Sequence, residues 1–255
     1  MAASRVGERG IRHCLRGFFD AWLTRNCAVC SLDLKTSETG ICAGCIASLP
    51  GASSLRCSIC GLKLPPTLQT GSMSGDHSTE RICAACRIRP PAFDQSIVLA
   101  DYAAPLDRLI QALKFGHQLA LADALGNLLA QRLPPCKATL PTVLTAVPLA
   151  PKRLASRGFN QSERMAREIA RVHRVRLFIR GVTRLRDTPA QSALPLASRL
   201  SNLAGAFGVD PVFAGARVIL VDDVMTSGAT LQELACALKK AGASEVINLV
   251  VARTP

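Results

Sequence analysis

Aromatic residues are scarce in this sequence, which holds one Trp, one Tyr and eight Phe among 255 residues. So few rings leave little material for a surface that binds single strands mainly by stacking on bases. Acidic residues are also few: 18 Asp and Glu stand against 31 Lys and Arg, so the net charge is +13. The partners expected from such a surplus are polyanions, namely nucleic acid, a phosphorylated substrate or anionic lipid.

Long apolar runs are missing as well. No stretch approaches the roughly 20 residues that cross a bilayer, and arginines interrupt the short apolar stretches of the first 25 residues. We therefore expect a soluble, cytoplasmic protein with no transmembrane segment and no secretory signal. A hydrophobic content of 49% with 19% charged residues excludes a disordered or fibrous chain and suits one full domain with a smaller module.

Cysteine, in contrast, is abundant and unevenly placed. Eight of the eleven cysteines form CxxC pairs in the first third of the chain: Cys27 with Cys30, Cys42 with Cys45, Cys57 with Cys60, and Cys83 with Cys86. Two CxxC turns that face each other supply the four thiolates of a closed tetrahedral zinc site. The four turns therefore predict two structural Zn²⁺ ions. Sequential pairing of the turns is simplest, and the spacing leaves an interleaved pairing open. Redox-active dithiols are the alternative, which four clustered copies disfavour.

Metal binding would replace the hydrophobic core that about sixty residues with few rings cannot build. Gly61, directly after Cys60, permits the positive φ that a cysteine turn often needs. His77, in the polar loop at 61–80, is an extra candidate ligand, although the thiolates alone complete both sites. Residues 1–26 predict a leader with an amphipathic helix at 11–23, which we expect to pack against the cysteine module rather than on a membrane.

Strand and helix patterns alternate after residue 90, so we place a double zinc ribbon at 27–90 and a larger domain at 91–255. Buried strands are expected at 96–100, 142–147, 217–221 and 246–251, and helices at 105–116, 119–133, 160–173 and 228–240. The third helix should begin at a capping box of Asn160 and Glu163 and bury Met165, Ile169 and Val172. This alternation predicts an α/β fold, a parallel sheet with helices on both faces.

The most informative stretch is VILVDDVMTSGAT at 218–230, in which a buried strand and two acids precede a loop of small residues that opens a helix. Ligands of parallel sheets bind beyond the carboxyl ends of strands, where the next helix offers unpaired N–H groups. Thr226, Ser227 and Thr230 add hydroxyl donors, and Gly228 lets the backbone approach an anion closely. The loop therefore predicts a phosphate site. It lacks the Gly-Lys-Ser/Thr ending of a P-loop.

The two acids of this stretch, Asp222 and Asp223, are placed to accept hydrogen bonds from the diol of a ribose whose phosphate lies in the loop. The alternative is a solvated acidic turn after a strand. The coincidence of strand, acids, small-residue loop and helix favours the binding site.

Positive charge is concentrated at 151–186, where eleven Lys and Arg stand against two acids, a local balance of +9. Four of these arginines recur at helical spacing: Arg164, Arg167, Arg171 and Arg174. Such a stripe can follow a nucleic-acid backbone. A solvated helix face has the same pattern, and the sequence leaves both interpretations open.

Residues 218–230 resemble the phosphoribosyl pyrophosphate (PRPP) motif of type I phosphoribosyltransferases. The cysteine ribbon together with VPLAPKRLASRGFNQSERMAREIA at 147–170 resembles the ComF family of competence proteins and its GntX relatives. The most distinctive part is RGFNQ, which is Arg157, Gly158, Phe159, Asn160 and Gln161. A second matching stretch at 188–207 carries Gln191, Arg199, Asn202 and Phe207. The resemblance spans about residue 27 to the end of the chain.

This resemblance implies a phosphoribosyltransferase-like domain that binds PRPP with Mg²⁺. Asp222 and Asp223 would act as the catalytic acids, beside a binding loop of Val224, Met225, Thr226, Ser227, Gly228, Ala229 and Thr230. By the same analogy the turn at 148–153 holds pyrophosphate. Lys152, Arg153 and Arg157 suit that anion because guanidinium forks match phosphate oxygens. Catalysis would be mostly electrostatic, with cations on the leaving pyrophosphate and the acids beside the ribose cation.

Three functions follow as hypotheses. The first is a ComF-like protein that binds PRPP and single-stranded DNA and acts in DNA uptake, natural transformation or nucleotide recycling, together with proteins of the uptake machinery. The second is an active phosphoribosyltransferase of nucleotide salvage, whose basic helix serves its anionic substrate. The third is a regulatory module that senses PRPP without turnover. The phosphate loop agrees with all three, the arginine stripe favours the first, and a fold alone does not choose among them.

Overall fold

The computed structural model describes residues 26–35, 38, 40–65, 81–134, 140–185 and 205–254. The expected leader helix at 11–23, His77, and the family positions Gln191, Arg199 and Asn202 lie outside these ranges. Within the described part of the chain, no helix is both long enough and apolar enough to cross a membrane.

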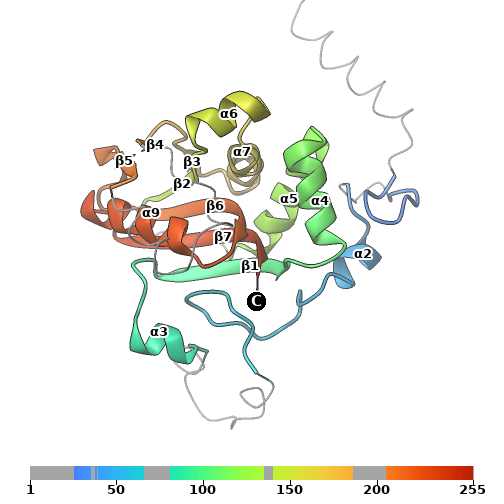
Figure 1. Ribbon diagram of the computed structural model, residues 1–255, viewed down its shortest axis with the longest axis horizontal. Helices are drawn as coiled ribbons and strands as arrows, with labels where there is room; N and C mark the ends of the chain where they lie inside the picture. Colours follow the sequence, from blue (N-terminus) through green and yellow to red (C-terminus); the bar gives the residue numbers. More distant parts are fainter. Residues whose placement is uncertain are drawn as a thin grey trace, which may run out of the picture.

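A five-stranded parallel sheet forms the centre of the larger domain (Figure 1). In spatial order its strands are β1 (Gln95–Asp101), β7 (Glu245–Arg253), β6 (Arg217–Met225), β2 (Thr142–Ala146) and β3 (Arg176–Leu177). Every neighbouring pair is parallel. The central strands β6 and β7 are nearly continuous runs of Val, Ile and Leu, because both faces of such strands are covered. The expected fold class is confirmed.

Helices cover both faces of this sheet. One core contains residues of α4 (Leu106–Phe115), α5 (Leu119–Arg132) and α7 (Gln161–His173), which lie on the same side of the strands (Figure 1). The other core contains the apolar face of α9 (Ala229–Lys240). Both faces of the sheet are therefore covered. The loops after β2 and β6 meet at its carboxyl edge, which leaves this edge as the place for a binding site.

Several short elements were not predicted from the sequence. They are the helix α6 (Pro151–Arg157), the 3-10 turn η3 (Pro211–Phe213), and a two-stranded antiparallel sheet of β4 (Val182–Arg184) and β5 (Phe207–Val209). The edge strand β3 was missed as well. Strands of two or three residues are too short to show a hydrophobic period.

The predicted buried face of α7 is correct at its centre and wrong at its end. Met165 and Ile169 are fully buried, whereas Val172 is 44% exposed. In this last turn His173 makes the contact with α5, since its Nε2 lies 2.8 Å from the carbonyl oxygen of Ala130. The helix thus turns an imidazole rather than a valine toward its neighbour.

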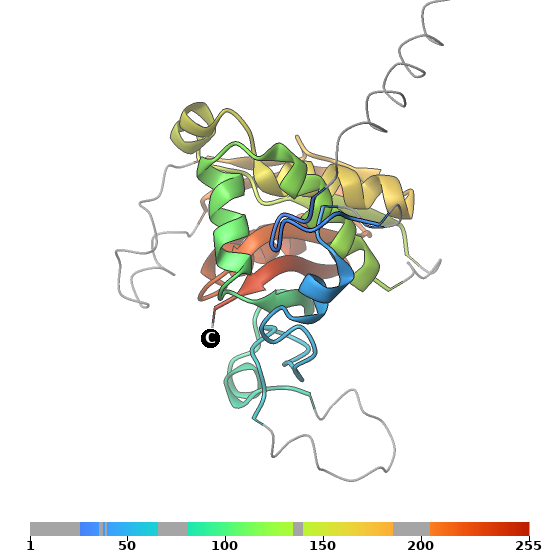
Figure 2. The same ribbon diagram turned by 90° about the vertical axis from the view of Figure 1, so that its right-hand side faces the viewer.

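The cysteine-bearing segments fold as two similar units, which Figure 2 shows against the larger domain. In each unit a CxxC turn lies between two bridged residues, and the next CxxC begins a five-residue helix, α2 (Ala43–Ala47) or α3 (Ala84–Ile88). Gly61 has the expected positive φ, +69°, and the matching position in the first unit is Ser31 at +61°. The two units therefore repeat each other in structure as well as in sequence.

Both cysteine units pack against the larger domain. The first contributes Ile41 and Leu49 to the core beneath α4 and α5, and the second contributes Leu64 to the core of α9. The second unit lies directly on β1: a Cβ on Gly61 would come within 2.4 Å of Cγ2 of Val98. An edge strand covered in this way is protected from pairing with other chains.

Candidate functional site

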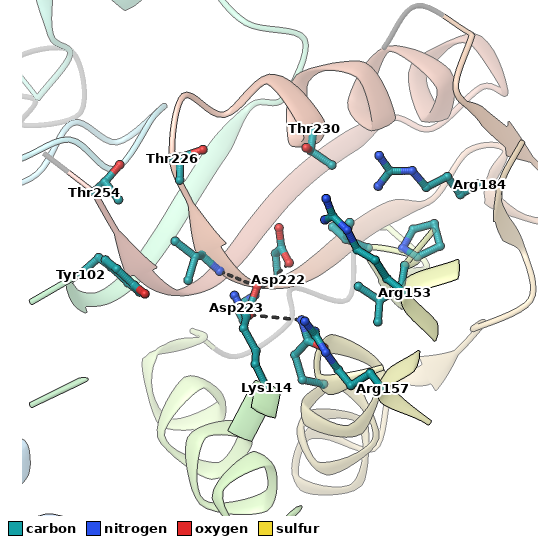
Figure 3. A pocket seen from close by; sticks show the side chains of 15 residues that line it. Tyr102, Lys114, Arg153, Arg157, Arg184, Asp222, Asp223, Thr226, Thr230 and Thr254 are labelled. Carbon is teal, nitrogen blue, oxygen red and sulfur yellow. Dashed lines mark hydrogen bonds and ion pairs between the residues drawn. The ribbon is translucent and has the colours of Figure 1, made fainter. Parts of the chain in front are cut away.

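A cavity of about 360 Å³ lies at the carboxyl edge of the sheet (Figure 3). It is bounded by the ends of β1, β2, β6 and β7 and by α4, α6 and β4. Its charged lining consists of Lys114, Arg153, Arg157, Arg184, Asp222 and Asp223. Four cations and two acids in one cavity suit an anionic ligand that also carries hydroxyl groups or a metal ion.

Strand β6 carries the acid pair into this cavity. Asp223 is only 5% exposed, which does not agree with a solvated acidic turn. Ser162 Oγ donates to Asp222 Oδ1 at 3.1 Å, and Gln161 Nε2 donates to Asp223 Oδ2 at 3.2 Å. Burial, and then the charge of Asp223, raise the pKa of Asp222 well above its usual range. A cation placed beside the pair would therefore stabilise the two ionised carboxylates.

Such a cation is already supplied by α4. Nζ of Lys114 lies 2.5 Å from Oδ2 of Asp223, the same oxygen that accepts from Gln161. Gln161 in turn accepts a hydrogen bond from Nη1 of Arg157 at 2.6 Å. A chain of polar contacts thus runs from the guanidinium of Arg157 through the amide of Gln161 and the carboxylate of Asp223 to the ammonium group of Lys114.

The RGFNQ residues build the turn that holds this arrangement. Arg157 ends α6, and Gly158 follows in the left-handed region with φ +79°. Asn160 then caps α7, because its Oδ1 accepts from the backbone N–H of Ser162 at 3.0 Å. Its Nδ2 donates to the carbonyl oxygen of Val147 at 3.0 Å. The loop after β2 and the start of α7 are therefore fixed to each other beside the acid pair.

The predicted phosphate loop separates two cavities. Val224, Thr226 and Thr230 line the main cavity, whereas Met225 is buried and the residues 227–229 lie beside a second cavity of about 390 Å³ against the second cysteine unit. Gly228 has φ +79°, and a Cβ there would come within 2.7 Å of Cε of Met225. The positive φ favours glycine at this position, and a side chain there would also displace the end of Met225.

The cations predicted for pyrophosphate divide between the cavity and the surface. Arg153 and Arg157 line the cavity, and Lys152 is exposed on α6. Figure 3 shows Arg153, Arg157 and Arg184 together on one side of the acids. Arg184 comes from β4 and its guanidinium lies 5.6 Å from the ring centre of Phe207.

Sequence reasoning missed four cavity residues: Tyr102, Lys114, Arg184 and Thr254. Each lies at or near the end of a different element, and neither a motif nor a fixed spacing connects it to the acids. Only Tyr102 had a signal, because the one tyrosine of the chain comes two residues after a predicted strand.

The arginine stripe of α7 is largely ion-paired. The pairs are Arg164 with Asp123 at 3.1 Å, Arg167 with Glu163 at 2.6 Å, and Arg171 with Glu168 at 2.5 Å. Arg174 lies beyond the helix as its C-cap residue, with φ +53°. Three carboxylates thus offset most of the stripe's charge, which favours the interpretation as a solvated helix face.

The eight paired cysteines form two groups, Cys27, Cys30, Cys42 and Cys45, and Cys57, Cys60, Cys83 and Cys86. Within each group all sulfur atoms lie within 4.8 Å of one another, so sequential pairing is confirmed and interleaved pairing is wrong. Sγ atoms of Cys30 and Cys42 are 3.8 Å apart, and those of Cys60 and Cys83 are 3.6 Å apart. Four sulfurs at about 2.3 Å from a tetrahedral zinc ion would be separated by about 3.8 Å. The donor set and its spacing fit Zn²⁺.

Backbone N–H groups donate hydrogen bonds to sulfur atoms of both cysteine groups. The N–H groups of Cys42 and Val29 donate to Sγ of Cys27 at 3.3 and 3.4 Å, and the N–H of Cys83 donates to Sγ of Cys57 at 3.3 Å. Burial raises the pKa of Cys27, but such N–H donors outweigh it and hold that pKa below its usual range. The same balance lowers the pKa of Cys57. Thiolates stabilised in this way are good metal ligands.

The chain is similar in sequence to several known proteins. Residues 154–255 match the family described as the phosphoribosyl transferase domain. The DNA utilization protein YhgH of Escherichia coli strain K12 is 34% identical over 232 residues, which cover 89% of this chain and 96% of that protein. Competence protein F of Haemophilus influenzae is 31% identical over 230 residues, 86% of this chain and 93% of that protein. Among solved structures, the allosteric regulatory enzyme of purine biosynthesis is 25% identical, covers 51% of this chain and 25% of that one, and gives a TM-score of 0.35.

Proposed function

Because the chain belongs to the ComF and YhgH family of competence and DNA utilization proteins and carries a phosphoribosyltransferase domain, we propose that it binds PRPP with Mg²⁺ at the carboxyl edge of its sheet. The proposal takes single-stranded DNA, or nucleotides released from it, as the second partner. The names of the relatives support a role in the uptake or reuse of DNA.

The observation that carries the PRPP proposal is the meeting of three groups in one cavity. The loop after β6 offers Thr226 and Thr230 to a phosphate, the acids Asp222 and Asp223 lie directly before it, and three arginines lie beyond the acids. A 5-phosphoribose group spans the first two positions, with its diol at the acids. Its pyrophosphate then reaches the arginines, whose forks match phosphate oxygens.

Mg²⁺ bound with PRPP supplies charge neutralisation at the pyrophosphate oxygens. Asp222 and Asp223 provide the oxygen ligands that such a hard cation prefers. Lys114 neutralises Asp223 from the side of α4, and Gln161 orients the same carboxylate. The protein therefore holds the acids in place before any ligand arrives, which is the preorganisation that electrostatic stabilisation needs.

We propose further that two Zn²⁺ ions hold the cysteine units as structural sites within a ribbon at 27–90, which precedes the phosphoribosyltransferase domain at 91–255. Closed sites with four protein ligands leave no position for a substrate. The ions would hold the turns that rest on β1 and on the loop after β6.

Calorimetric titration with PRPP and Mg²⁺ tests the ligand. Binding to the natural chain, and its loss in Asp222→Asn and Asp223→Asn variants, is expected because a neutral amide attracts Mg²⁺ less than a carboxylate does. Asp107→Asn is the matched control, since this acid of α4 is not part of the cavity lining. Equal PRPP affinity in all four proteins would contradict the proposal.

An active phosphoribosyltransferase is the second candidate, favoured by the three guanidinium groups in the cavity, which suit a leaving pyrophosphate. A screen of nucleobases for pyrophosphate release distinguishes it from binding without turnover. Release with one base identifies the acceptor, whereas tight PRPP binding without release with any base supports the regulatory module.

A further inference from the structure

Phe115, the last residue of α4, is 72% exposed. The guanidinium of Arg157, from α6, lies 5.6 Å from the centre of its ring. A cation on one face of an exposed ring leaves the other face open to a second planar group. Single exposed apolar residues are common and need no explanation of their own, so the surroundings of this ring decide what it means.

Two further rings lie at the same end of the molecule. His117 follows Phe115 in the turn before α5, and its imidazole lies 6.0 Å from the ring of Phe159 at 57°. Phe159 comes from the RGFNQ turn, directly after α6. In a chain with few aromatic residues this gathering is informative, because Phe93, Phe207 and Phe213 are buried in the core instead.

The helix α6, which precedes Phe159 in the chain, carries only positive charge. α6 has no buried residue and no acid, and it presents Lys152, Arg153 and Arg157. Arg153 and Arg157 also line the main cavity. Arg157 therefore joins the cavity to the exposed ring, and Lys152 adds positive charge at the other end of α6, with α6 and α4 on the same side of the sheet (Figure 1).

We propose that this surface, formed by Phe115, Lys152, Arg157 and Phe159 and called the rim platform, binds a single strand of nucleic acid. A base stacks on Phe115, and the phosphates face the cations of α6. Stacking platforms beside positive grooves are how proteins hold single strands without reading their sequence. The inference rests on the DNA part of the proposed function and assigns its surface.

A single strand fits this surface better than a duplex or a protein. The bases of a duplex are paired and stacked, so they cannot cover an isolated ring, whereas a single strand exposes each base. The three cations of α6, on a helix that has no acid, attract the phosphates of such a strand.

The strand is expected to follow α6 rather than α7. The hollow of about 580 Å³ between Phe159 and α7 is lined by Glu163 and Glu168 as well as by arginines. These carboxylates would repel phosphates, and they already pair with the arginines of the α7 stripe.

Fluorescence anisotropy with a labelled oligothymidylate of 20 nucleotides tests the rim platform at several salt concentrations, using the full chain loaded with zinc. Phe115→Ala is expected to weaken binding by about tenfold, the size of one lost base stack, with an unchanged salt slope. Phe115→Trp is expected to retain the affinity, because it restores the ring. Lys152→Ala is expected to lower the salt slope by about 0.7, the value of one phosphate contact on a single strand.

Ile88→Ala is the matched control, because Ile88 is an apolar residue of α3 that is 85% exposed and lies outside the platform. Its affinity should equal that of the natural chain, and melting temperatures of all variants report folding. The platform is overturned if the Phe115→Ala and Phe115→Trp variants both bind as the natural chain does, or if Arg171→Ala alone weakens binding. In those cases the DNA part of the proposed function survives, whereas an oligonucleotide that does not bind the natural chain at all refutes both.

Discussion

Arg253, at the end of β7, donates a hydrogen bond through Nε to the carbonyl oxygen of Cys60 at 3.1 Å. Through Nη1 the same side chain donates to the carbonyl oxygens of Met225, at 3.1 Å, and Thr226. Arg253 is only 6% exposed. One buried guanidinium therefore ties the second cysteine group to the loop that is proposed to hold phosphate.

This contact predicts coupling between the metal and PRPP. We expect removal of zinc from the second cysteine group to weaken PRPP binding roughly tenfold, because Cys60 would no longer hold Arg253 and the loop would lose its fixed position. Calorimetry on the full chain after graded chelation measures the effect.

Linkage is reciprocal, so PRPP should slow the loss of one of the two zinc ions to a chelator and leave the other unchanged. The first cysteine group serves as the internal control, since it packs near α5 and, among the residues that the structure describes, none of its cysteines hydrogen-bonds to Arg253. Two ions that leave at the same rates with and without PRPP would show that the groups are not coupled.

Replacement of Arg253 by Met should destabilise the fold by about 3 kcal/mol, because the carbonyl oxygens of Cys60, Met225 and Thr226 lose a charged donor. Thermal or denaturant unfolding of the zinc-loaded chain measures the change. Lys239→Met is the comparison, because Lys239 forms a half-exposed ion pair with Asp94, and such pairs contribute about 1 kcal/mol or less. Equal losses in the two variants would mean that the buried network contributes little.

Gly228 and Gly215 offer a matched pair of variants. Both have positive φ, +79° and +72°, so alanine strains the backbone by about 1 kcal/mol at either position. A Cβ at Gly228 would also come within 2.7 Å of Cε of Met225, so the end of that side chain would have to move beside the loop, whereas a Cβ at Gly215 meets nothing within 4 Å. We expect Gly228→Ala to lose PRPP affinity and Gly215→Ala to keep it, in calorimetric titrations of both. Similar affinities would remove the loop from the binding site.

Replacement of Gln161 should change the affinity for PRPP more than the stability of the fold. Gln161→Leu removes the hydrogen bonds to Asp223 and from Arg157, so we expect PRPP affinity to fall by about tenfold with a small change in melting temperature. Gln161→Glu places a third carboxylate beside the acid pair and should weaken binding further. If Gln161→Glu bound more tightly than Gln161→Leu, repulsion at the acid pair would not govern the site.

Much of the architecture is predictable from the sequence, because it depends on residues that are close in the chain. Each CxxC turn brings two thiolates together within four residues, and Asn160 caps its own helix. The stretch at 218–230 specifies strand, acids, loop and helix in turn. Local spacing and backbone preference were sufficient for these features.

Other parts of the site depend on packing between distant segments. Lys114 and Asp223 are far apart in the sequence, as are Arg253 and Cys60, and no motif links either pair. The pairing of Arg164 with Asp123 likewise joins two helices and could not be read from the spacing of the arginines.

The sequence by itself determined the chemical groups of this protein: eight thiolates, an acid pair before a small-residue loop, and a surplus of cations. The tertiary structure alone decided which cations lie near the acids, which cations are paired with carboxylates, and which cation lies against an exposed ring. The physical reason lies in the parallel sheet. It brings the carboxyl ends of strands from distant parts of the chain to one edge, so the residues that meet there are set by strand order and not by distance along the sequence.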